Sequence, residues 1–260
     1  MNEVWEELNS EAENVGREER LLLDYLSECI LTHDSFESAL SFILANKVSD
    51  DVMSADTLRA LFLDILKVSP SIVDCAIEDI KAVYDRDPAV CSFLSVILYL
   101  KGYQAIQVHR LANFLWNDNR KELALFIQSR NTEVFSVDIH PACEIGSGIM
   151  FDHATGIVIG ETTVIEDNVS ILQQVTLGGT GNEQGDRHPK IRSGVLISAG
   201  AKVLGNIEIG EGAKIGAGSV VLNSVPPHTT VVGVPARVVG TPASNSPAET
   251  MQQNVLEDEQ

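Results

Sequence analysis

The chain has 260 residues, 37 of them acidic and 18 basic, which gives a formal net charge of −19. This length allows one large domain or two modest ones, and 44% hydrophobic residues supply enough apolar side chains for a core, which excludes global disorder. The excess of negative charge also excludes nucleic acid and anionic membrane surfaces as main partners, because both would repel the chain.

Neither secretion nor disulfide bonding is predicted. The N-terminus, MNEVWEELNSEAENV, is acidic and polar, unlike a signal peptide. The apolar run at 93–100 is too short to span a bilayer. The four cysteines lie far apart without a CxxC pair, which favours buried free thiols over disulfides or a zinc knuckle: Cys29, Cys75, Cys91 and Cys143. We therefore expect a cytoplasmic protein.

Residues 1–136 are predicted to form an all-α domain. They contain only two of the 19 glycines, Gly16 and Gly102. Apolar residues recur at helical spacing in 21–31, 35–48 and 56–68, and Ser69-Pro70 begins a further helix. This helix is interrupted before Pro88, because the residue preceding a proline avoids the α region, and helical periodicity resumes over 91–117.

Residues 137–240 hold the other 17 glycines and repeat every six residues. Every sixth residue from 139 to 175, and from 191 to 221 after ten skipped residues (181–190), is hydrophobic at twelve of thirteen positions, with Thr163 the exception. A hexapeptide period is typical of a β-helix, in which three hexads form one triangular coil. A β-sandwich would need alternation with a period of two and fits poorly. We predict a β-helix with 181–190 extruded as a loop, followed by a flexible acidic tail at 241–260.

The histidines of this half are the candidate catalytic residues, since imidazole transfers protons near neutral pH. His140, His153 and His188 each lie in a polar context, whereas His33 and His109 fall in the helical half and His228 is assigned no role. The zinc carbonic anhydrases built on this fold use a histidine pair five residues apart. Here the spacings are 13 and 35, so no metal site is predicted.

Asp138 and His153 form a candidate acid–base pair. They are 15 residues apart, three short of one coil, so they lie at offset corners of adjacent coils or face each other across a subunit boundary. A carboxylate bonded to one imidazole nitrogen would let the other nitrogen take a proton from a hydroxyl. A capped surface histidine is the alternative. Cys143, the one cysteine of this half, has no activating neighbour in the sequence and is a poor candidate nucleophile.

Several longer runs resemble the bacterial serine O-acetyltransferase family. They are 137–142 (VDIHPA), 152–161 (DHATGIVIGE), 175–181 (VTLGGTG), 186–191 (DRHPKI) and 214–221 (KIGAGSVV), together with 85–89 (DRDPA) and 98–105 (LYLKGYQA) in the helical half. The likeness covers roughly residues 75–240, and hexapeptide proteins in general lack the DRDP and GDRHP elements. It implies an α+β protein whose β-helix is left-handed.

The resemblance also assigns roles to individual residues. It implies that His153, paired with Asp138, is the general base for direct attack of the L-serine hydroxyl on acetyl-CoA. Asp87 and Asp152 would hold the serine ammonium, and Arg187 with His188 would receive its carboxylate. This is the pair of clamps that a zwitterion needs. Residues near acetyl-CoA would be Ala199, Lys214 and Ala217, with no permanent cofactor and no metal.

The resemblance further implies partners and a pathway. The family works in cysteine biosynthesis, is inhibited by L-cysteine, and assembles trimers into hexamers through the helical domains. Partnership with O-acetylserine sulfhydrylase is not expected, because that partner receives a terminal isoleucine and this chain is written with Gln260 last. The alternatives are a hexapeptide acetyltransferase for another hydroxyl compound and a β-helix scaffold without activity.

Overall fold

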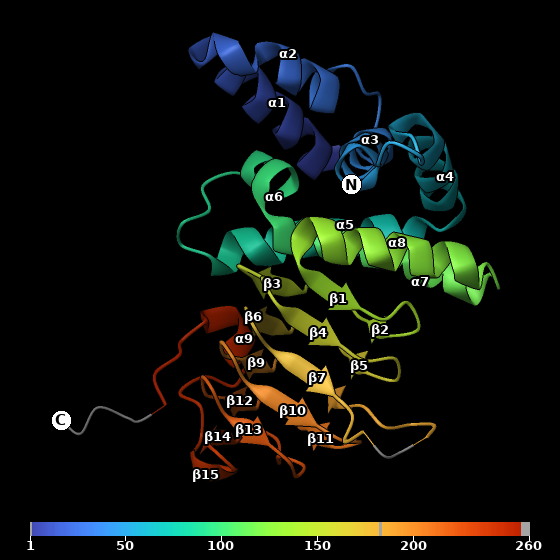
Figure 1. Ribbon diagram of the computed structural model, residues 1–260. Coiled ribbons are helices and arrows are strands. Elements are labelled where there is room, and N and C mark those ends of the chain that lie inside the picture. The colour runs from blue at the N-terminus through green and yellow to red at the C-terminus, as the bar shows by residue number, and fades with distance from the viewer. Residues whose placement is uncertain (1, 182–183, 256–260) are drawn as a thin grey trace.

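The computed structural model describes residues 2–181 and 184–255, with helices first and a β-helix after them (Figure 1). The helical elements are α1 (Asn2–Glu18), the 3-10 turn η1 (Arg20–Leu22), α2 (Leu23–Leu26), the π turn η2 (Ser27–Leu31), α3 (Phe36–Val48), α4 (Ala55–Val68), α5 (Pro70–Arg86), α6 (Phe93–Tyr99), α7 (Lys101–Asn117), α8 (Lys121–Phe135) and, in the tail, α9 (Pro247–Thr250).

Local sequence explains where several of these helices begin. Ser35, Ser54 and Ser92 each accept a hydrogen bond from the backbone N–H three residues later, which caps α3, α4 and α6. Pro70 opens α5, as predicted. Two expectations need correction. The segment 21–31 is an irregular succession of 3-10, α and π turns, and 91–117 is divided into α6 and α7 at Leu100, which has an extended backbone.

The second half is a parallel β-helix of left-handed hexapeptide coils, so the predicted fold class is confirmed. Its strands are β1 (Val137–Ile139), β2 (Glu144–Ile145), β3 (Met150–Asp152), β4 (Ile157–Ile159), β5 (Val164–Ile165), β6 (Ser170–Leu172), β7 (Thr176–Gly178), β8 (Lys190–Ile191), β9 (Leu196–Ile197), β10 (Lys202–Leu204), β11 (Glu208–Ile209), β12 (Lys214–Ile215), β13 (Val220–Val221), β14 (Thr230–Gly233) and β15 (Ala236–Gly240).

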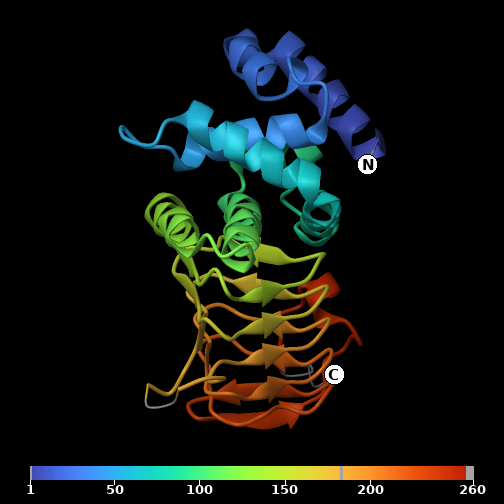
Figure 2. The same ribbon diagram turned by 90° about the vertical axis from the view of Figure 1, so that its right-hand side faces the viewer.

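These strands form three faces. The first face is β1-β4-β7-β10-β13, the second β2-β5-β8-β11, and the third β3-β6-β9-β12-β14-β15. Successive coils stack along the axis, as the side view shows (Figure 2). The inward side chains of each coil lie on those of the next and are mostly aliphatic and fully buried, for example Ile159, Leu177 and Val203 on the first face.

The strand register corrects the predicted repeat at two places. Strand β3 pairs with β6 at a spacing of 20 residues, whereas β4 pairs with β7 at 18, so two extra residues lie between β3 and β4. The spacing rises to 26 between β5 and β8, which places eight extra residues between β7 and β8. The loop therefore runs from 179 to 189, and Lys190, predicted to lie in the loop, belongs to β8.

Helices α5, α7 and α8 lie across the open end of the β-helix (Figure 1). Asp79 of α5 is fully buried there and accepts hydrogen bonds from the backbone N–H of Ile149 (2.8 Å) and from Arg110 of α7 (2.7 Å). Gly102 lets α7 approach closely, because a Cβ at this position would lie 2.0 Å from the Phe151 carbonyl oxygen. The helical layer is thereby fixed to the first coil, which contains Asp138, Asp152 and His153 of the candidate site.

The tail differs from the flexible segment predicted for 241–260. Residues 241–255 return along the third face, where Ala248 is buried and its carbonyl accepts a hydrogen bond from the Ser170 hydroxyl (2.8 Å). Residues 256–260, including Gln260, lie outside the described residues. Within the described part of the chain, no helix has the length and apolar character that membrane crossing requires.

Candidate active site

His153 lies in the β3–β4 turn, where the two extra residues of the first coil are located. Both His153 and Ala154 have positive φ (55° and 61°), which makes this turn bulge out of the regular coil. The His153 side chain is 74% exposed, and its Nε2 lies 3.8 Å from Asp152 Oδ1 at the end of β3. The predicted base is therefore presented to solvent rather than packed into its own chain.

Two carboxylates converge beside His153. Asp87 is the first residue after α5, and its Oδ1 accepts the Ala89 N–H at 2.9 Å. Burial is the main cause that raises the pKa of Asp152; the nearby Asp87 charge raises it further, while His153 opposes the shift. The structure thus brings together Asp87, Asp152 and His153, three of the predicted site residues, although Asp87 is 65 residues from Asp152 in the sequence.

Asp138 is the central residue of β1, the edge strand of the first face, and its side chain lies outward. Its Oδ1 accepts a hydrogen bond from Gln128 Nε2 of α8 at 2.8 Å. No hydrogen bond or ion pair joins Asp138 to His153 within the described part of one chain. The contact between offset corners of one chain is therefore not formed among these residues.

Arg187 and His188 lie at the other end of β4, over the β4–β5 turn. Arg187 forms a 2.7 Å ion pair with Glu161. Its backbone N–H and that of His188 both donate to the Thr162 hydroxyl oxygen, at 3.0 and 3.1 Å. The loop is therefore fixed to the coil at the two residues predicted to receive a carboxylate.

The orientation of His188 is fixed by its neighbours. The Thr162 N–H donates to His188 Nδ1 (3.1 Å), so Nδ1 has no proton and Nε2 is the nitrogen that bears one. Burial, and then the Arg187 charge, lower the pKa of His188, which keeps the ring neutral near pH 7. The ring lies directly over Gly160, where a Cβ would be 2.1 Å from His188 Nε2. His188 is therefore a fixed neutral donor.

The two groups of site residues do not meet within one chain. The β3–β4 turn precedes strand β4 (Ile157–Ile159) and the β4–β5 turn follows it. Residues 156 and 160 are four steps apart, or about 13 Å of extended chain. A single chain thus presents a half-site of carboxylates at one corner of the coil and, at another, a half-site of the donors Arg187 and His188.

Ala199 and Ala217 stack below His153 at the same corner of the β-helix. Backbone hydrogen bonds connect this corner from coil to coil: Gln174 N–H to Thr155 O (2.8 Å), Gly200 N–H to Gln173 O (2.9 Å) and Gly218 N–H to Ala199 O (2.8 Å). Ala199 is half-buried and Ala217 is exposed. The edge below His153 is therefore lined by small residues.

Lys214 lies apart from this edge, on the third face beneath the tail. Its side chain is 2% exposed and donates to the backbone carbonyl of Asn254. Burial lowers its pKa. The tail thus covers Lys214, and its side chain is not exposed to solvent.

The structure also bears on the rival chemistries. Cys143 is fully buried, and burial raises the pKa of its thiol, which disfavours the thiolate that a nucleophile needs. His140 packs edge-on against Trp116 (5.0 Å between ring centroids) and accepts the Ala142 N–H at Nδ1. No group of three or more metal-binding side chains is arranged around a common point in residues 2–181 and 184–255.

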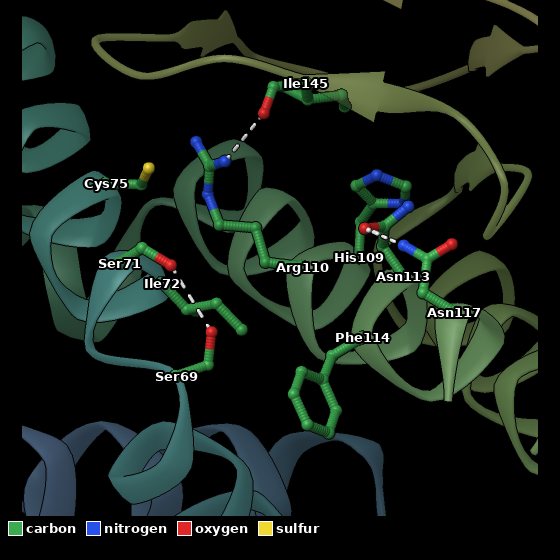
Figure 3. A pocket seen from close by; sticks show the side chains of 10 residues that line it. All are labelled: Ser69, Ser71, Ile72, Cys75, His109, Arg110, Asn113, Phe114, Asn117 and Ile145. Atoms are coloured by element: carbon green, nitrogen blue, oxygen red, sulfur yellow. Dashed lines mark hydrogen bonds between the residues drawn. The ribbon is translucent and has the colours of Figure 1, made fainter.

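A polar cavity of about 310 Å³ lies elsewhere, between the starts of α5 and β2 and the side of α7 (Figure 3). His109 and Arg110 line it, and Arg110 reaches the Ile145 carbonyl at 3.0 Å. Both side chains are buried, and burial lowers the pKa of His109 to about 3. This cavity contains none of the predicted site residues and belongs to the joint between the two halves.

Sequence reasoning missed the residues that support the site. Glu161 binds Arg187, Thr162 orients His188, and Gln128 binds Asp138. Glu161 lies within the run 152–161 that carries the family resemblance, which was its only signal. Gln128 follows no motif, and its role depends on how α8 packs against β1.

Comparison with known proteins decides the family. The profile described as "Serine acetyltransferase, N-terminal" matches residues 4–108, and "Bacterial transferase hexapeptide (six repeats)" matches 188–223. The serine acetyltransferase of Haemophilus influenzae is 54% identical over 96% of this chain and 94% of its own length. The chain belongs to the serine acetyltransferase family. It is accordingly an acyltransferase enzyme, as the sequence predicted.

Solved structures of serine acetyltransferases agree over nearly the whole chain. One, in complex with cysteine, has a TM-score of 0.96 and 54% identity, covering 98% of this chain and all of that one (100%). Another, from Brucella abortus in complex with coenzyme A, has a TM-score of 0.91 and 51% identity, covering 93% and 96%. The likeness thus includes the first seventy residues, which the sequence motifs alone did not reach.

Proposed function

We propose that this enzyme transfers the acetyl group of acetyl-CoA to the hydroxyl of L-serine, giving O-acetyl-L-serine and CoA for cysteine biosynthesis. The observation that carries the proposal is the pair of half-sites, one formed by carboxylates and the other by hydrogen-bond donors. Asp87 and Asp152 suit the ammonium of an amino acid, and Arg187 with the Nε2–H of His188 suits its carboxylate. The relatives named serine acetyltransferase and the structure with coenzyme A support the same substrates.

In the proposed reaction His153 acts as general base. It takes the proton of the serine hydroxyl while Oγ attacks the thioester carbonyl carbon. The C–S bond then breaks, and the CoA thiolate takes the proton back from the imidazolium. No residue becomes acetylated, in agreement with the inert Cys143. Asp138 would fix the tautomer of His153 from a neighbouring subunit.

The acetyl-CoA chain would lie along the small-residue edge below His153. Ala199 and Ala217 leave room there for the pantetheine beside a row of backbone amides. This path directs the thioester to the β3–β4 turn, where His153 is exposed. Lys214 would contact a phosphate only after Asn254 releases it.

A complete site would form between subunits of a trimer, two of which would join into a hexamer. Each chain has its two half-sites at opposite ends of β4, so a cyclic arrangement can place the His153 corner of one chain against the Arg187–His188 corner of the next. Three such contacts close a ring and leave no half-site unused.

L-Cysteine is proposed as a feedback inhibitor at the same site. It shares with L-serine the ammonium and carboxylate that the half-sites would bind, and it differs only in carrying a thiol in place of the hydroxyl. The structure of a relative in complex with cysteine supports this proposal. Inhibition should be competitive with serine, and inhibition that persists unchanged at saturating serine would place cysteine elsewhere.

Thiol release from acetyl-CoA tests the reaction, with L-serine, D-serine and a sugar as alternative acceptors. We expect release with L-serine alone; release with the sugar would favour an acetyltransferase for another hydroxyl compound, and absence of acetyl-CoA binding would favour a scaffold. Co-assembly of His153→Ala with His188→Ala chains tests the shared site. Random mixing should restore about one quarter of wild-type activity if the site spans two chains, and none if it lies within one.

A further inference from the structure

Arg86, in the last turn of α5, has no part in the function described so far. Its side chain is only 8% exposed, although the residues on either side are more accessible. Burial lowers its pKa, which reflects the cost of taking the guanidinium out of water. A buried cation beside a binding residue needs a structural reason, and its hydrogen bonds supply one.

The guanidinium of Arg86 bridges two coils of the β-helix. Nη1 donates to the Gly148 carbonyl (2.9 Å) in the β2–β3 turn and to the Ser170 hydroxyl (3.1 Å) at the start of β6. Nη2 donates to Asn168 Oδ1 (3.2 Å) in the β5–β6 turn. The acceptors are all neutral, so the interaction depends on geometry more than on charge pairing. The guanidinium presents its five N–H donors in a fixed planar fork, and the three donors of a lysine ammonium on a flexible stem do not reproduce that geometry.

The turns that Arg86 contacts also contact each other. The Asn168 N–H donates to the Ser147 carbonyl (2.8 Å). Gly148 has a φ of +66°, and a Cβ there would lie 2.5 Å from Asn168 Oδ1, so the Asn168 side chain packs against Gly148. Gly148 is four residues before Asp152, at the other end of β3. Arg86 therefore connects the end of α5 to the strand that carries Asp152.

Asp87 follows Arg86 directly, and it leaves the helix with an extended backbone (φ −98°, ψ 107°). Asp87 and Asp152 carry like charges; burial is the main cause that raises the pKa of Asp152, and the Asp87 charge raises it further. Two like charges stay together only when the surrounding structure holds them there. Arg86 directly precedes Asp87, so its contacts with the β-helix fix the backbone at Asp87 against the repulsion between these like charges.

We propose that Arg86 is a positioning residue, which holds Asp87 opposite Asp152 so that both carboxylates reach the substrate ammonium. This inference rests on the proposed function, because it assumes that an amino acid occupies the site. It predicts that loss of the fork weakens the binding of serine and of cysteine without affecting acetyl-CoA, whose proposed path lies along another edge.

The test is steady-state kinetics of Arg86→Lys, which keeps the charge but loses the fork. We expect the KM for serine and the inhibition constant for cysteine to rise in parallel by about tenfold to hundredfold, the range for a displaced binding group. The KM for acetyl-CoA should stay within about twofold of wild type, a factor worth well under 1 kcal/mol. Lys81→Gln is the matched control, since Lys81 lies exposed on the same helix and pairs only with Glu78 there.

Asn168→Gly provides a second variant, because its φ of 58° suits glycine and the change removes one acceptor while Arg86 remains. It should raise the serine KM by a smaller factor in the same direction. A wild-type serine KM in a folded Arg86→Lys enzyme overturns the inference. So does a variant in which both substrates weaken equally along with a lower Tm, which marks a purely structural role. Wild-type turnover with serine is measured first; its absence would remove the proposed function itself.

Discussion

Gly160→Ala should selectively weaken serine binding, because Gly160 leaves the space that His188 occupies. An added Cβ would lie 2.1 Å from His188 Nε2 and Cδ2, whereas ordinary contacts begin at 3.4 Å, so the ring must retreat by about 1.3 Å. The φ of Gly160 lies outside the left-handed region, so alanine brings no backbone strain. The substitution therefore acts through the ring.

A displacement of that size breaks the hydrogen bonds between His188 and Thr162, and it moves the His188 Nε2–H away from the carboxylate of the bound serine. Misplacement by about 1 Å can cost about a hundredfold, so we expect the serine KM to rise by that factor, equivalent to about 2.8 kcal/mol. Acetyl-CoA affinity should not change. The assay is CoA release at varied serine, with tryptophan fluorescence and Tm as checks of folding.

Gly179→Ala is the matched control on the other side of the same ring. Its added Cβ would lie 3.6 Å from His188 Nε2 and 3.4 Å from the Arg187 carbonyl, which are ordinary contacts. We expect a serine KM within about twofold of wild type, below 1 kcal/mol. If Gly160→Ala also keeps its serine KM, or if both variants lose serine binding equally, the placement of His188 in the substrate site is wrong.

Three further predictions concern the site. His153→Ala should lower kcat by about 10²–10⁴-fold with acetyl-CoA affinity retained by calorimetry; a variant that keeps a tenth of wild-type kcat would exclude His153 as the base. Acidification should raise the serine KM, because protonation of Asp152 removes the charge that holds the ammonium. The rise should begin at a higher pH than for an ordinary aspartate, since burial and the Asp87 charge raise the pKa of Asp152. Asp87→Asn should move this rise to lower pH, and no movement would disprove the coupling. Arg187→Ala should weaken cysteine inhibition about tenfold or more, as loss of a charge-assisted bond does, whereas equal inhibition of variant and wild type would remove Arg187 from the carboxylate site.

The hexapeptide period predicted the β-helix correctly, but the predicted series of inward positions did not account for the two places at which extra residues interrupt the repeat. Positions 157, 163, 169 and 175 fall two residues before the main inward column, because the β3–β4 turn contains two extra residues. The phase recovers at 191 because the ten skipped residues equal the eight of the loop plus these two. The positions two residues before the main column also point inward and form a second column. Thr163, the one polar member of the series, is buried in this second column, where small residues also pack. Periodicity alone could not separate two columns that both point inward.

Motifs could nominate the residues of the candidate site, but not their separation. Nothing in the sequence shows that His153 and His188 lie at opposite ends of β4, because this depends on which turn accommodates the extra residues. The partners Gln128 and Glu161 also depend on packing, since each meets its target only after α8 and the loop are placed. Arg86 was visible in the DRDP run, yet its role needs the positions of the β2–β3 and β5–β6 turns.

The two irregularities of the β-helix explain why a repetitive scaffold can carry a site. In a regular coil the turns are short and stack on those of the next coil, so they do not project a side chain that could act as an acid, a base or a substrate-binding group. The two-residue expansion projects His153, and the eight-residue loop brings Arg187 and His188 over the next corner. Because both lie on the coils nearest the helical layer, α5 can add Asp87 from above. Apart from Asp138 on β1, the candidate site residues of the β-helix thus lie at or next to the points at which the repeat is broken, and in the proposed function the unbroken coils below would provide a straight edge for the long cosubstrate.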